Sequence, residues 1–264
     1  MTSAAPSMGS SIDPDEIARF AKLAAAWWDP SGQFKPLHRF NPVRLRFIRD
    51  RLCQRFARDP AEAKPFRGLR ILDIGCGGGL VAEPLARLGA TVTGVDATLP
   101  NVSVAQAHAA DAELDIDYRH GAAEDLARAG EHFDVVLALE IVEHVADLDL
   151  FLDAAASMVK PGGAIILATL NRTARAFAFA IVGAEYVLGW LPRGTHDWRK
   201  FVRPSELARG LRRNGLEVGE LAGVSYNPLT DDWSLGRDVG VNYLAFATAA
   251  HAQSKVTMDE MRQR

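Results

Sequence analysis

Three side chains capable of acid–base or metal chemistry lie within five residues of one another in the stretch ALEIVEHVAD. They are two carboxylates, Glu140 and Glu143, and the imidazole of His144. They directly follow an apolar run, FDVVLAL, which predicts a buried strand. Charged groups at the end of such a strand are unfavourable unless they stay hydrated or are paired. We therefore expect them either to face water or to hold a charged ligand.

A glycine-rich loop forms a second candidate site. The segment LDIGCGGGL follows a predicted strand and precedes a helical pattern, so Gly75, Gly77 and Gly79 are expected at the carboxyl edge of a sheet. Without a Cβ atom, they let the backbone approach a nucleotide-like ligand. The next predicted strand ends about 20 residues further on at Asp96, where a carboxylate can accept both ribose hydroxyls. The G-x-G-x-G spacing differs from the G-x-G-x-x-G fingerprint of dinucleotide-binding loops. The loop also lacks the Lys-Ser/Thr pair of a P-loop, so a triphosphate is not the expected ligand.

The elements that must position these residues alternate along the chain. Short β-branched runs and helical stretches follow one another beyond residue 66, which is typical of a parallel sheet covered by helices on both faces. Before this region, two helices are predicted at 13–28 and 43–57, with a connection, GQFKPLHRFNP, between them. The predicted strands are RILDIG, TVTGVD, IDYRHG, FDVVLAL and GAIILATL, and VNYLAFATA is one of the closing strands.

Composition bounds the class of protein. The 264 residues are 48% hydrophobic and 24% charged, which is enough for a globular protein with a sizeable core. The net charge is −3 and the basic residues are scattered, so nucleic acid is not an expected partner. Cys53 and Cys76 lie far apart and suit neither a disulfide framework nor a metal knuckle, which favours a reducing cytoplasm. The amino terminus lacks the pattern of a signal peptide.

The glycine loop and Asp96 resemble the class I S-adenosylmethionine-dependent methyltransferases. From about 17 to 248 the chain is further similar to the ubiquinone-biosynthesis O-methyltransferase family, through segments such as WWDPSGQFKPLHRFNPVR, EIVEHVAD and GAEYVLGWLPRGTHDWRKFV. The resemblance implies an α/β fold, a doubly wound, mostly parallel sheet of seven strands with N-terminal helices and an inserted lid. The expected parts are a disordered tail at 1–15, a helical cap at 16–66, the methyltransferase domain at 67–250 with a lid and membrane-contact insertion at about 172–200, and a tail at 251–264.

The resemblance also implies S-adenosylmethionine as cofactor. Arg44 would contact its methionine carboxylate, as a planar guanidinium fork suits, although without the family Arg44 reads as a solvated helix charge. Ala123, next to Glu124, matches the place where such folds meet adenine, and Leu139 is expected as a wall of the site. The full set of expected cofactor contacts is Arg44, Gly75, Gly77, Asp96, Ala123 and Leu139.

In the family, an E-x-x-E-H cluster matched here by Glu140, Glu143 and His144 is thought to hold Mg²⁺. Oxygen-rich ligands suit such a hard ion. A phenol has a pKa near 10, so at neutral pH it is mostly in its protonated, poorly nucleophilic form. Two ways of exposing the phenolate stay open: coordination by the metal, or proton removal by His144 without a metal.

The implied function is methyl transfer from S-adenosylmethionine to ring hydroxyls of polyprenylated catechol or hydroquinol precursors of ubiquinone, at both O-methylation steps. Two alternatives are a nicotinamide-dependent oxidoreductase and a non-catalytic member that binds cofactor or lipid within a biosynthetic complex. The apolar stretch 174–194 is too short between charges to span a bilayer. Because basic residues flank it, we expect peripheral contact with an anionic membrane, on the cytoplasmic surface of the inner membrane.

Overall fold

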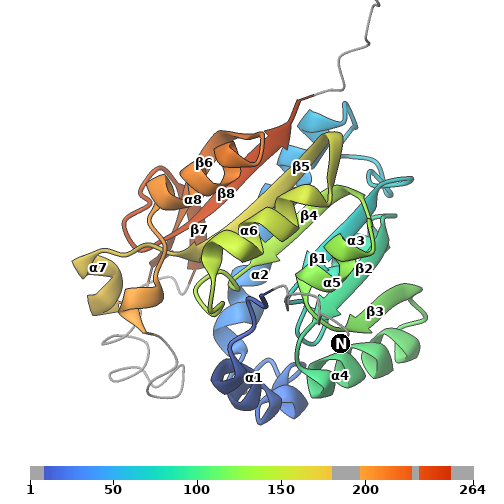
Figure 1. Ribbon diagram of the computed structural model, residues 1–264. Helices are drawn as coiled ribbons and strands as arrows, with labels where there is room; N and C mark the ends of the chain where they lie inside the picture. Colours follow the sequence, from blue (N-terminus) through green and yellow to red (C-terminus); the bar gives the residue numbers. More distant parts are fainter. Residues whose placement is uncertain (1–8, 180–196, 228–231, 251–264) are drawn as a thin grey trace, which may run out of the picture.

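One central sheet organises the molecule (Figure 1). The computed structural model describes residues 9–179, 197–227 and 232–250, and in this part of the chain eight strands pair in the order β3-β2-β1-β4-β5-β8-β6-β7. Strands β1 to β5 pair with one another in parallel, whereas β8 is antiparallel to both β5 and β6. The strands are β1 (Arg70–Ile74), β2 (Thr91–Asp96), β3 (Ile116–His120), β4 (Phe133–Leu139), β5 (Val159–Leu170), β6 (Leu216–Asn227), β7 (Asp232–Gly236) and β8 (Asn242–Ala249).

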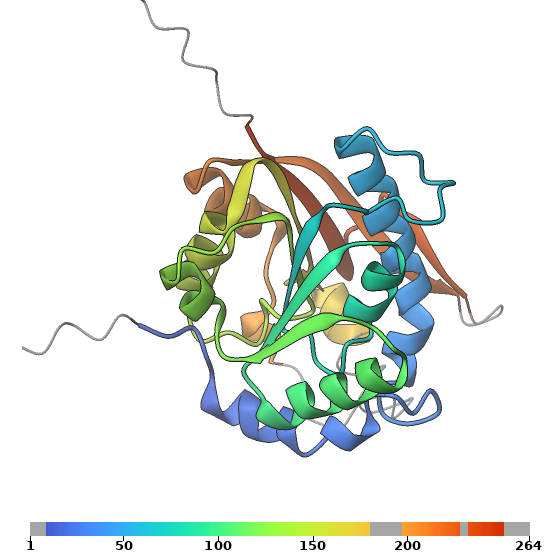
Figure 2. The same ribbon diagram turned by 90° about the vertical axis from the view of Figure 1, so that its right-hand side faces the viewer.

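Helices cover both faces of the sheet (Figure 2). Helices α2, α3 and α4 pack on one face, and α5, α6 and α8 pack on the other. This confirms the expected doubly wound α/β fold; β7 is an eighth strand, added at the edge by a hairpin with β6. The helices are α1 (Pro14–Ala21), η1 (Ala24–Ala26), α2 (Lys35–Arg55), α3 (Ala82–Arg87), α4 (Leu99–Asp111), α5 (Ala123–Arg128), α6 (Leu148–Ser157), α7 (Ala174–Ala176), η3 (Trp198–Lys200) and α8 (Pro204–Arg213).

Strand β4 shows why its sequence is apolar without interruption. Val135 and Leu137 point into the core under α2, α3 and α4, whereas Val136 and Ala138 point into the core under α5, α6 and α8. A strand buried on both faces needs apolar residues at every position. Each such aliphatic side chain contributes about 1.5–3 kcal/mol when fully buried. The hydrophobic effect therefore fixes the strand whose end carries Glu140.

Helix α2 is longer than the sequence pattern predicts. It begins at Lys35 rather than at 43, and it runs through Pro42. A proline inside a helix removes one backbone hydrogen bond and costs about 3 kcal/mol. Phe40, Val43 and Phe47 are all buried on the same side of α2 against the sheet. Burial of these side chains outweighs the proline penalty, which local propensity could not show.

The packed part of the chain starts before the predicted boundary at residue 15. Ser11 is buried; its N–H donates to Glu124 Oε1 over 2.9 Å, and its carbonyl accepts from the Ala146 N–H over 2.7 Å. Asp13 then caps α1 through the Asp15 N–H. The expectation of a tail is thus wrong for residues 9–15, because these contacts fix them. Residues 1–8, 180–196 and 251–264 lie outside the described residues, and the remaining domain division stays a prediction.

Neither cysteine forms a disulfide, and both are buried. Among the residues that the structure describes, no helix is long and apolar enough to cross a membrane.

Candidate active site

A cavity of about 580 Å³ lies at the carboxyl edge of the sheet. The ends of several strands line it, from Asp96 at the end of β2 to Trp233 in β7, and α1 and α2 contribute further walls. Parallel strands direct their carboxyl ends to one edge, where α/β proteins bind ligands. Eight of the sequence-predicted residues line this cavity: Arg44, Gly75, Asp96, Ala123, Leu139, Glu140, Glu143 and His144. Gly77, which was also expected to contact the cofactor, is not among the lining residues.

The glycine loop turns sharply after β1. Gly75 and Gly77 have φ of 70° and 54°, the left-handed region that glycine adopts without steric cost. At Gly77 the close approach comes from the chain itself, since an added Cβ would lie 2.3 Å from Trp27 Cζ2. The Gly77 N–H donates to Asp96 Oδ2 over 2.9 Å, which ties the loop to the end of β2. Gly77 therefore serves the packing of Trp27 on the loop.

Asp96 is held in one orientation by backbone and amide donors. Its Oδ1 accepts from the Thr98 N–H over 2.8 Å and from Asn101 Nδ2 over 3.2 Å. Burial raises its pKa, while these hydrogen bonds favour the ionised form. Two carboxylate oxygens offer about four acceptor positions, so acceptor capacity remains for a ribose hydroxyl.

Asp73, in β1 ahead of the glycine loop, is a buried carboxyl at the base of the cavity. Burial raises its pKa to about 7; Arg44 opposes this shift and Asp96 adds to it. A group that binds its proton more tightly in the folded state stabilises the fold below its unfolded pKa, near 3.9. This contribution is lost as the pH rises through the folded pKa, so the fold loses stability between about pH 4 and pH 7.

We predict that Asp73→Asn flattens this pH dependence. Between pH 5 and pH 7.5 the free energy of unfolding of the parent should fall by on the order of 2–3 kcal/mol more than that of the variant. Urea unfolding of the cofactor-free proteins at the two pH values measures this difference. Parallel pH dependences in parent and variant would show that Asp73 titrates normally.

Arg44 is a buried cation with an unsatisfied donor. Its side chain is 4% exposed; one terminal nitrogen donates to Asn41 Oδ1 over 3.0 Å, and Nε has no partner. Burial lowers its pKa, and the nearby carboxyls of Glu140 and Asp73 oppose that shift. A buried N–H without an acceptor is unfavourable, so a carboxylate ligand would complete this site. Arg44 thus fits the methionine carboxylate of the expected cofactor.

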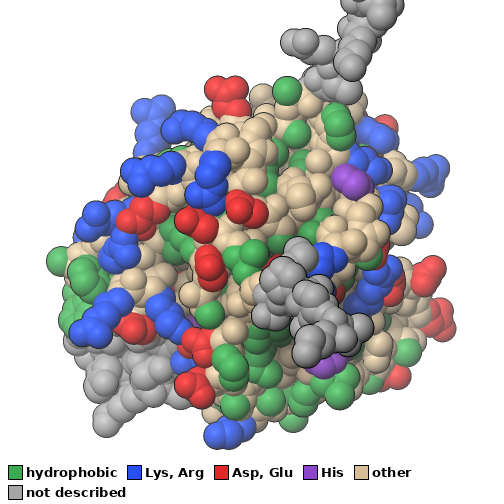
Figure 3. Space-filling model, in the orientation of Figure 1, with side chains coloured by type: hydrophobic (Ala, Val, Ile, Leu, Met, Phe, Trp, Pro, Cys, Tyr) green, Lys and Arg blue, Asp and Glu red, His purple; other side chains and the backbone are tan. Residues whose placement is uncertain are grey.

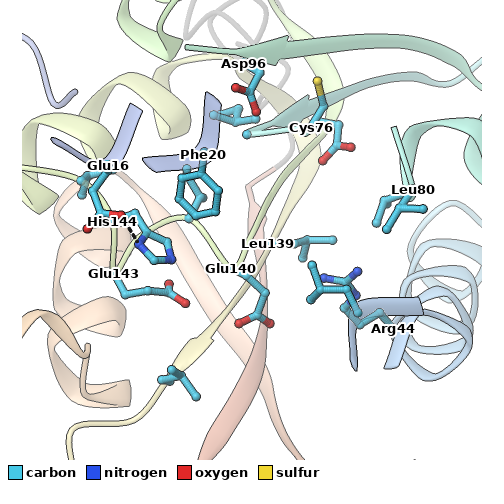
Figure 4. A pocket seen from close by; sticks show the side chains of 18 of the residues that line it. Glu16, Phe20, Arg44, Cys76, Leu80, Asp96, Leu139, Glu140, Glu143 and His144 are labelled. Carbon is cyan, nitrogen blue, oxygen red and sulfur yellow. Dashed lines mark hydrogen bonds and ion pairs between the residues drawn. The ribbon is translucent and has the colours of Figure 1, made fainter. Parts of the chain in front are cut away.

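Glu124 lies where adenine is expected, beside Ala123 at the start of α5. Its Oε1 accepts the Ser11 N–H, and its Oε2 is buried without a partner. An unpaired buried acceptor suits an amino-group donor such as that of adenine. Leu139, the last residue of β4, lines the cavity beside Arg44 and forms an apolar wall there (Figure 4).

The two glutamates lie together at the middle of the cavity. Glu140 has φ of 53°, a strained conformation for a residue with a Cβ atom, and its buried carboxyl neighbours that of Glu143. Thr169 Oγ1 donates to Glu143 Oε2 over 2.7 Å. Burial and the neighbouring Glu140 raise the pKa of Glu143 to about 8, and burial raises that of Glu140. Two buried carboxyls in contact therefore share a proton at neutral pH.

His144 contacts Glu16 of α1 (Figure 4). Its Nδ1 lies 3.1 Å from Glu16 Oε2 and 3.4 Å from Arg19 Nη2. The carboxylate is the nearer partner, so we assign a proton to Nδ1, which donates it to Glu16. Arg19 and Lys200 surround Glu16, and Lys200 also pairs with Asp13 over 2.6 Å.

The three residues of the E-x-x-E-H cluster do not meet as one ligand set. No group of three His, Cys, Asp or Glu side chains in the described part of the chain is placed to hold a metal ion. His144 is paired with Glu16 instead. Glu140 and Glu143 alone fit a hard divalent ion, because a cation can replace the proton that two buried carboxyls share and Mg²⁺ needs few protein carboxylates.

Two contributors to the site were not predicted from the sequence. Glu16 belongs to a helix 128 positions away from His144, so no local spacing indicates the pair. Trp27 packs on the glycine loop and donates from Nε1 to Asn101 Oδ1 over 2.9 Å. The only sequence signal for Trp27 was its place in the segment WWDP.

Comparison with known proteins defines the class. A family model described as a methyltransferase domain matches residues 40–221. The magnesium protoporphyrin IX methyltransferase of Synechocystis PCC 6803, solved with bound SAH, has a TM-score of 0.59 at 19% identity and covers 89% of this chain and 94% of its own. A possible histamine N-methyltransferase from Thermotoga maritima also has a TM-score of 0.59, at 20% identity, over 89% of this chain and 98% of its own. The fold, the domain match and the glycine-loop site make this an S-adenosylmethionine-dependent methyltransferase of class I.

Closer relatives define the family. The ubiquinone biosynthesis O-methyltransferase of Brucella anthropi is 58% identical over 238 residues, which cover 90% of this chain and 96% of the relative. That of Parvibaculum lavamentivorans is 59% identical over 241 residues, covering 91% and 95%. The chain belongs to the ubiquinone biosynthesis O-methyltransferase family. This confirms the resemblance seen in the sequence and rules against the oxidoreductase alternative.

Proposed function

We propose that the protein transfers the methyl group of S-adenosylmethionine to ring hydroxyls of polyprenylated catechols or hydroquinols, at both O-methylation steps of ubiquinone biosynthesis. One observation carries the proposal: a single cavity joins the cofactor-type contacts of Arg44 and Asp96 to the proton-handling groups Glu140, Glu143 and His144. Cofactor and acceptor oxygen can then lie side by side. The similarity to the ubiquinone biosynthesis O-methyltransferases of Brucella anthropi and Parvibaculum lavamentivorans supports the same reaction.

Arg44 and Asp96 are the proposed residues that bind and orient the cofactor. The cofactor, when bound, supplies a methyl group on a positively charged sulfur. Arg44 would hold its carboxylate through the unpartnered Nε, and Asp96 would accept from the ribose. Fixing both ends holds the methyl group in line with the acceptor oxygen, and such positioning supplies a large part of the rate of a displacement reaction.

His144 is the proposed general base. Its Nε2 carries the lone pair once Nδ1–H points at Glu16, and the residue lines the cavity. A base that removes the phenolic proton at neutral pH exposes the stronger nucleophile. Glu16 would act as a positioning residue that fixes the tautomer and stabilises the imidazolium formed on proton transfer.

Glu140 and Glu143 are the proposed holders of Mg²⁺. When bound, the ion would supply positive charge that favours the ionised form of the acceptor oxygen. Without it, the two carboxyls keep their shared proton, and the hydrogen bond from Thr169 fixes Glu143 in place.

The function is tested by the release of S-adenosylhomocysteine from purified protein given a short-chain prenylated catechol. The matched control is the same ring with both hydroxyls replaced by hydrogen. We expect release only with the catechol. No release above the control would favour a non-catalytic member that binds cofactor or lipid.

For the cofactor half, Asp96→Ala should weaken S-adenosylmethionine binding by on the order of 1–3 kcal/mol, because a charged acceptor for ribose hydroxyls is lost. Titration calorimetry measures the change, and Asp117→Ala, which removes an exposed aspartate on β3, is the matched control. Unchanged affinity in Asp96→Ala would mean that the ribose binds elsewhere.

Peripheral membrane contact is part of the proposal. Phe177 and Phe179, next to α7, are 45% and 64% exposed, although most of the expected insertion lies outside the described residues. Lys and Arg side chains gather over α8 on the same face, where Arg209, Arg212 and Arg213 are exposed (Figure 3). Exposed aromatic rings beside basic residues suit an anionic lipid surface on the cytoplasmic side of the inner membrane.

The double variant Phe177→Asp/Phe179→Asp should lose co-sedimentation with anionic liposomes by about tenfold or more, because each carboxylate opposes both insertion and surface attraction. Leu99→Asp is the matched control, since Leu99 is 55% exposed in α4, away from α7. Equal losses in both variants, or none in the double variant, would count against a contact at this site.

A further inference from the structure

We propose that the prenyl chain of the acceptor runs across β5, β8, β6 and β7 at the cavity edge of the sheet and leaves the cavity past an aromatic wall of Phe40, Tyr226 and Trp233. This inference rests on the proposed function and names the place of the lipid part of its substrate. It follows from the order of the strands, the contacts of the three rings and the distribution of charge in the cavity.

Strand order divides the cavity into two halves. Asp96 and the glycine loop lie over β2 and β1, and Glu140 follows β4 in the middle. The sheet continues for four strands beyond β4, and their ends at this edge line the cavity with Leu170, Asn242, Val224 and Trp233. At about 4.8 Å between strands, this half extends roughly 19 Å from β4. No residue expected to contact the cofactor lies in that half, so it is available to the acceptor.

Three aromatic rings line this half of the cavity, from Phe40 beside Arg44 to Tyr226 and Trp233 at the edge of the sheet. The ring centroids of Phe40 and Trp233 are 5.4 Å apart, and those of Tyr226 and Trp233 are 5.1 Å apart. Phe40 comes from α2, whereas Tyr226 and Trp233 face each other across the β6–β7 hairpin. The added edge strand β7 thus completes a wall that the other seven strands would not provide.

The wall connects directly to the reacting centre. The guanidinium carbon of Arg44 lies 4.9 Å from the centroid of Phe40, and Arg44 also neighbours Glu140. A substrate whose ring hydroxyl reaches Glu140 therefore has Phe40 within reach of its ring substituent. The catalytic groups and the wall are parts of one continuous surface.

The cavity-lining residues that belong to β5, β8, β6 and β7 carry no charge, and the charged lining residues Asp13 and Glu16 are paired with Lys200. Arg175 and Asp238, which also line the cavity, are exposed at the mouth and are ion-paired to each other. The walls between this mouth and Arg44 include Val224, Leu170 and the three rings. Such walls favour a long uncharged isoprenoid chain as ligand. Its binding removes apolar surface from water without leaving a buried charge unpaired.

A second apolar way out passes Phe179, but the structure favours the wall. Phe179 is 64% exposed, whereas Trp233 and Tyr226 are half-buried and fixed by ring contacts. A chain ordered against fixed rings gains more contact than one against a largely solvated side chain.

The test is a series of catechols that carry a methyl group or one, two or three isoprenoid units. We define the chain-length ratio as kcat/KM for the three-unit compound divided by that for the methyl compound. In the parent this ratio should exceed about ten, because each unit buries further apolar surface. Trp233→Ala should lower the ratio by about tenfold, as for the loss of one large aromatic contact, whereas Trp233→Phe should change it less than about threefold.

Phe179→Ala is the control for the other exit, and Tyr226→Ala is a second wall variant if Trp233→Ala does not fold. Melting temperature and S-adenosylmethionine affinity verify that each variant is folded. A ratio near one in the parent, or a ratio lost in Phe179→Ala and retained in the wall variants, would overturn the path. If even the methyl catechol is not methylated by the parent, the proposed function itself fails.

Discussion

Replacing His144 with alanine is expected to lower kcat by about 10²–10⁴-fold, the usual contribution of a positioned general base. The side chain is 9% exposed and touches Glu16 and Phe20, so its loss removes the base and little of the core. Stopped-flow or steady-state methyl transfer to a short-chain prenylated catechol measures the loss. S-adenosylmethionine affinity should stay the same, because the expected cofactor contacts lie with Arg44 and Asp96.

Glu16 provides the internal control for this role. Glu16→Gln keeps the shape but weakens the hydrogen bond that orients Nδ1, so kcat should fall by about tenfold or more while KM for the cofactor is unchanged. Asp15→Asn, one position earlier on the exposed side of α1, is the matched substitution. If Glu16→Gln behaves like Asp15→Asn, or if His144→Ala retains its kcat, another group takes the proton.

Substitution of Glu140 should separate stability from activity. Its φ of 53° strains any residue with a Cβ atom, and its buried carboxyl has a raised pKa. Glu140→Gly removes both penalties, so it should be as stable as the parent, and about 1 kcal/mol more stable than Glu140→Ala, which keeps the strained backbone. Both variants should lose about 10²-fold or more in kcat, since a buried group at the reaction centre is gone. Thermal unfolding and methyl transfer measured on the same samples test this.

Removal of metal ions with a chelator tests whether Glu140 and Glu143 hold a metal ion. Activity that is lost to a chelator and restored by Mg²⁺ in the parent, but not in Glu140→Ala, would support a metal held by Glu140 and Glu143. Activity that is unchanged by the chelator would show that the reaction needs no metal ion. The proton transfer would then depend on His144 alone. A Glu140→Gly variant that melts well below Glu140→Ala would contradict the backbone-strain argument.

The sequence predicts the sheet well because the signal is local. The run FDVVLAL is buried on both faces in β4, and the glycine loop follows β1 as the motif requires. The start of α2 was wrong because Pro42 argues locally against a helix, whereas the burial of Phe40 and Phe47 depends on a sheet far away in sequence. Edge strand β7 was missed for a similar reason: its residues are mostly exposed and show little apolar alternation.

The residues of the site likewise fall into those that a local motif predicts and those that it does not. Residues within a motif were predicted and are found together, as Gly77 and Asp96 are through their hydrogen bond. Contacts between residues far apart in sequence were not predicted. Examples are Glu16 with His144 and Ser11 with Glu124. His144 was grouped with the glutamates because it follows Glu143 in sequence, but its side chain turns to α1, since successive residues of a loop need not face the same way. Contact between distant segments is thus the part that spacing cannot supply.

The measurement that tests the central claim most directly is the fate of a labelled methyl group. Purified protein is incubated with S-adenosylmethionine carrying a ¹³C-methyl group and with a catechol bearing one isoprenoid unit, and the product is identified by NMR and mass spectrometry. One cavity that joins the cofactor contacts of Arg44 and Asp96 to the proton-handling residues predicts the label on a ring oxygen, with one S-adenosylhomocysteine for each methyl transferred. Bound cofactor with no labelled product, or label on a ring carbon, would contradict the account.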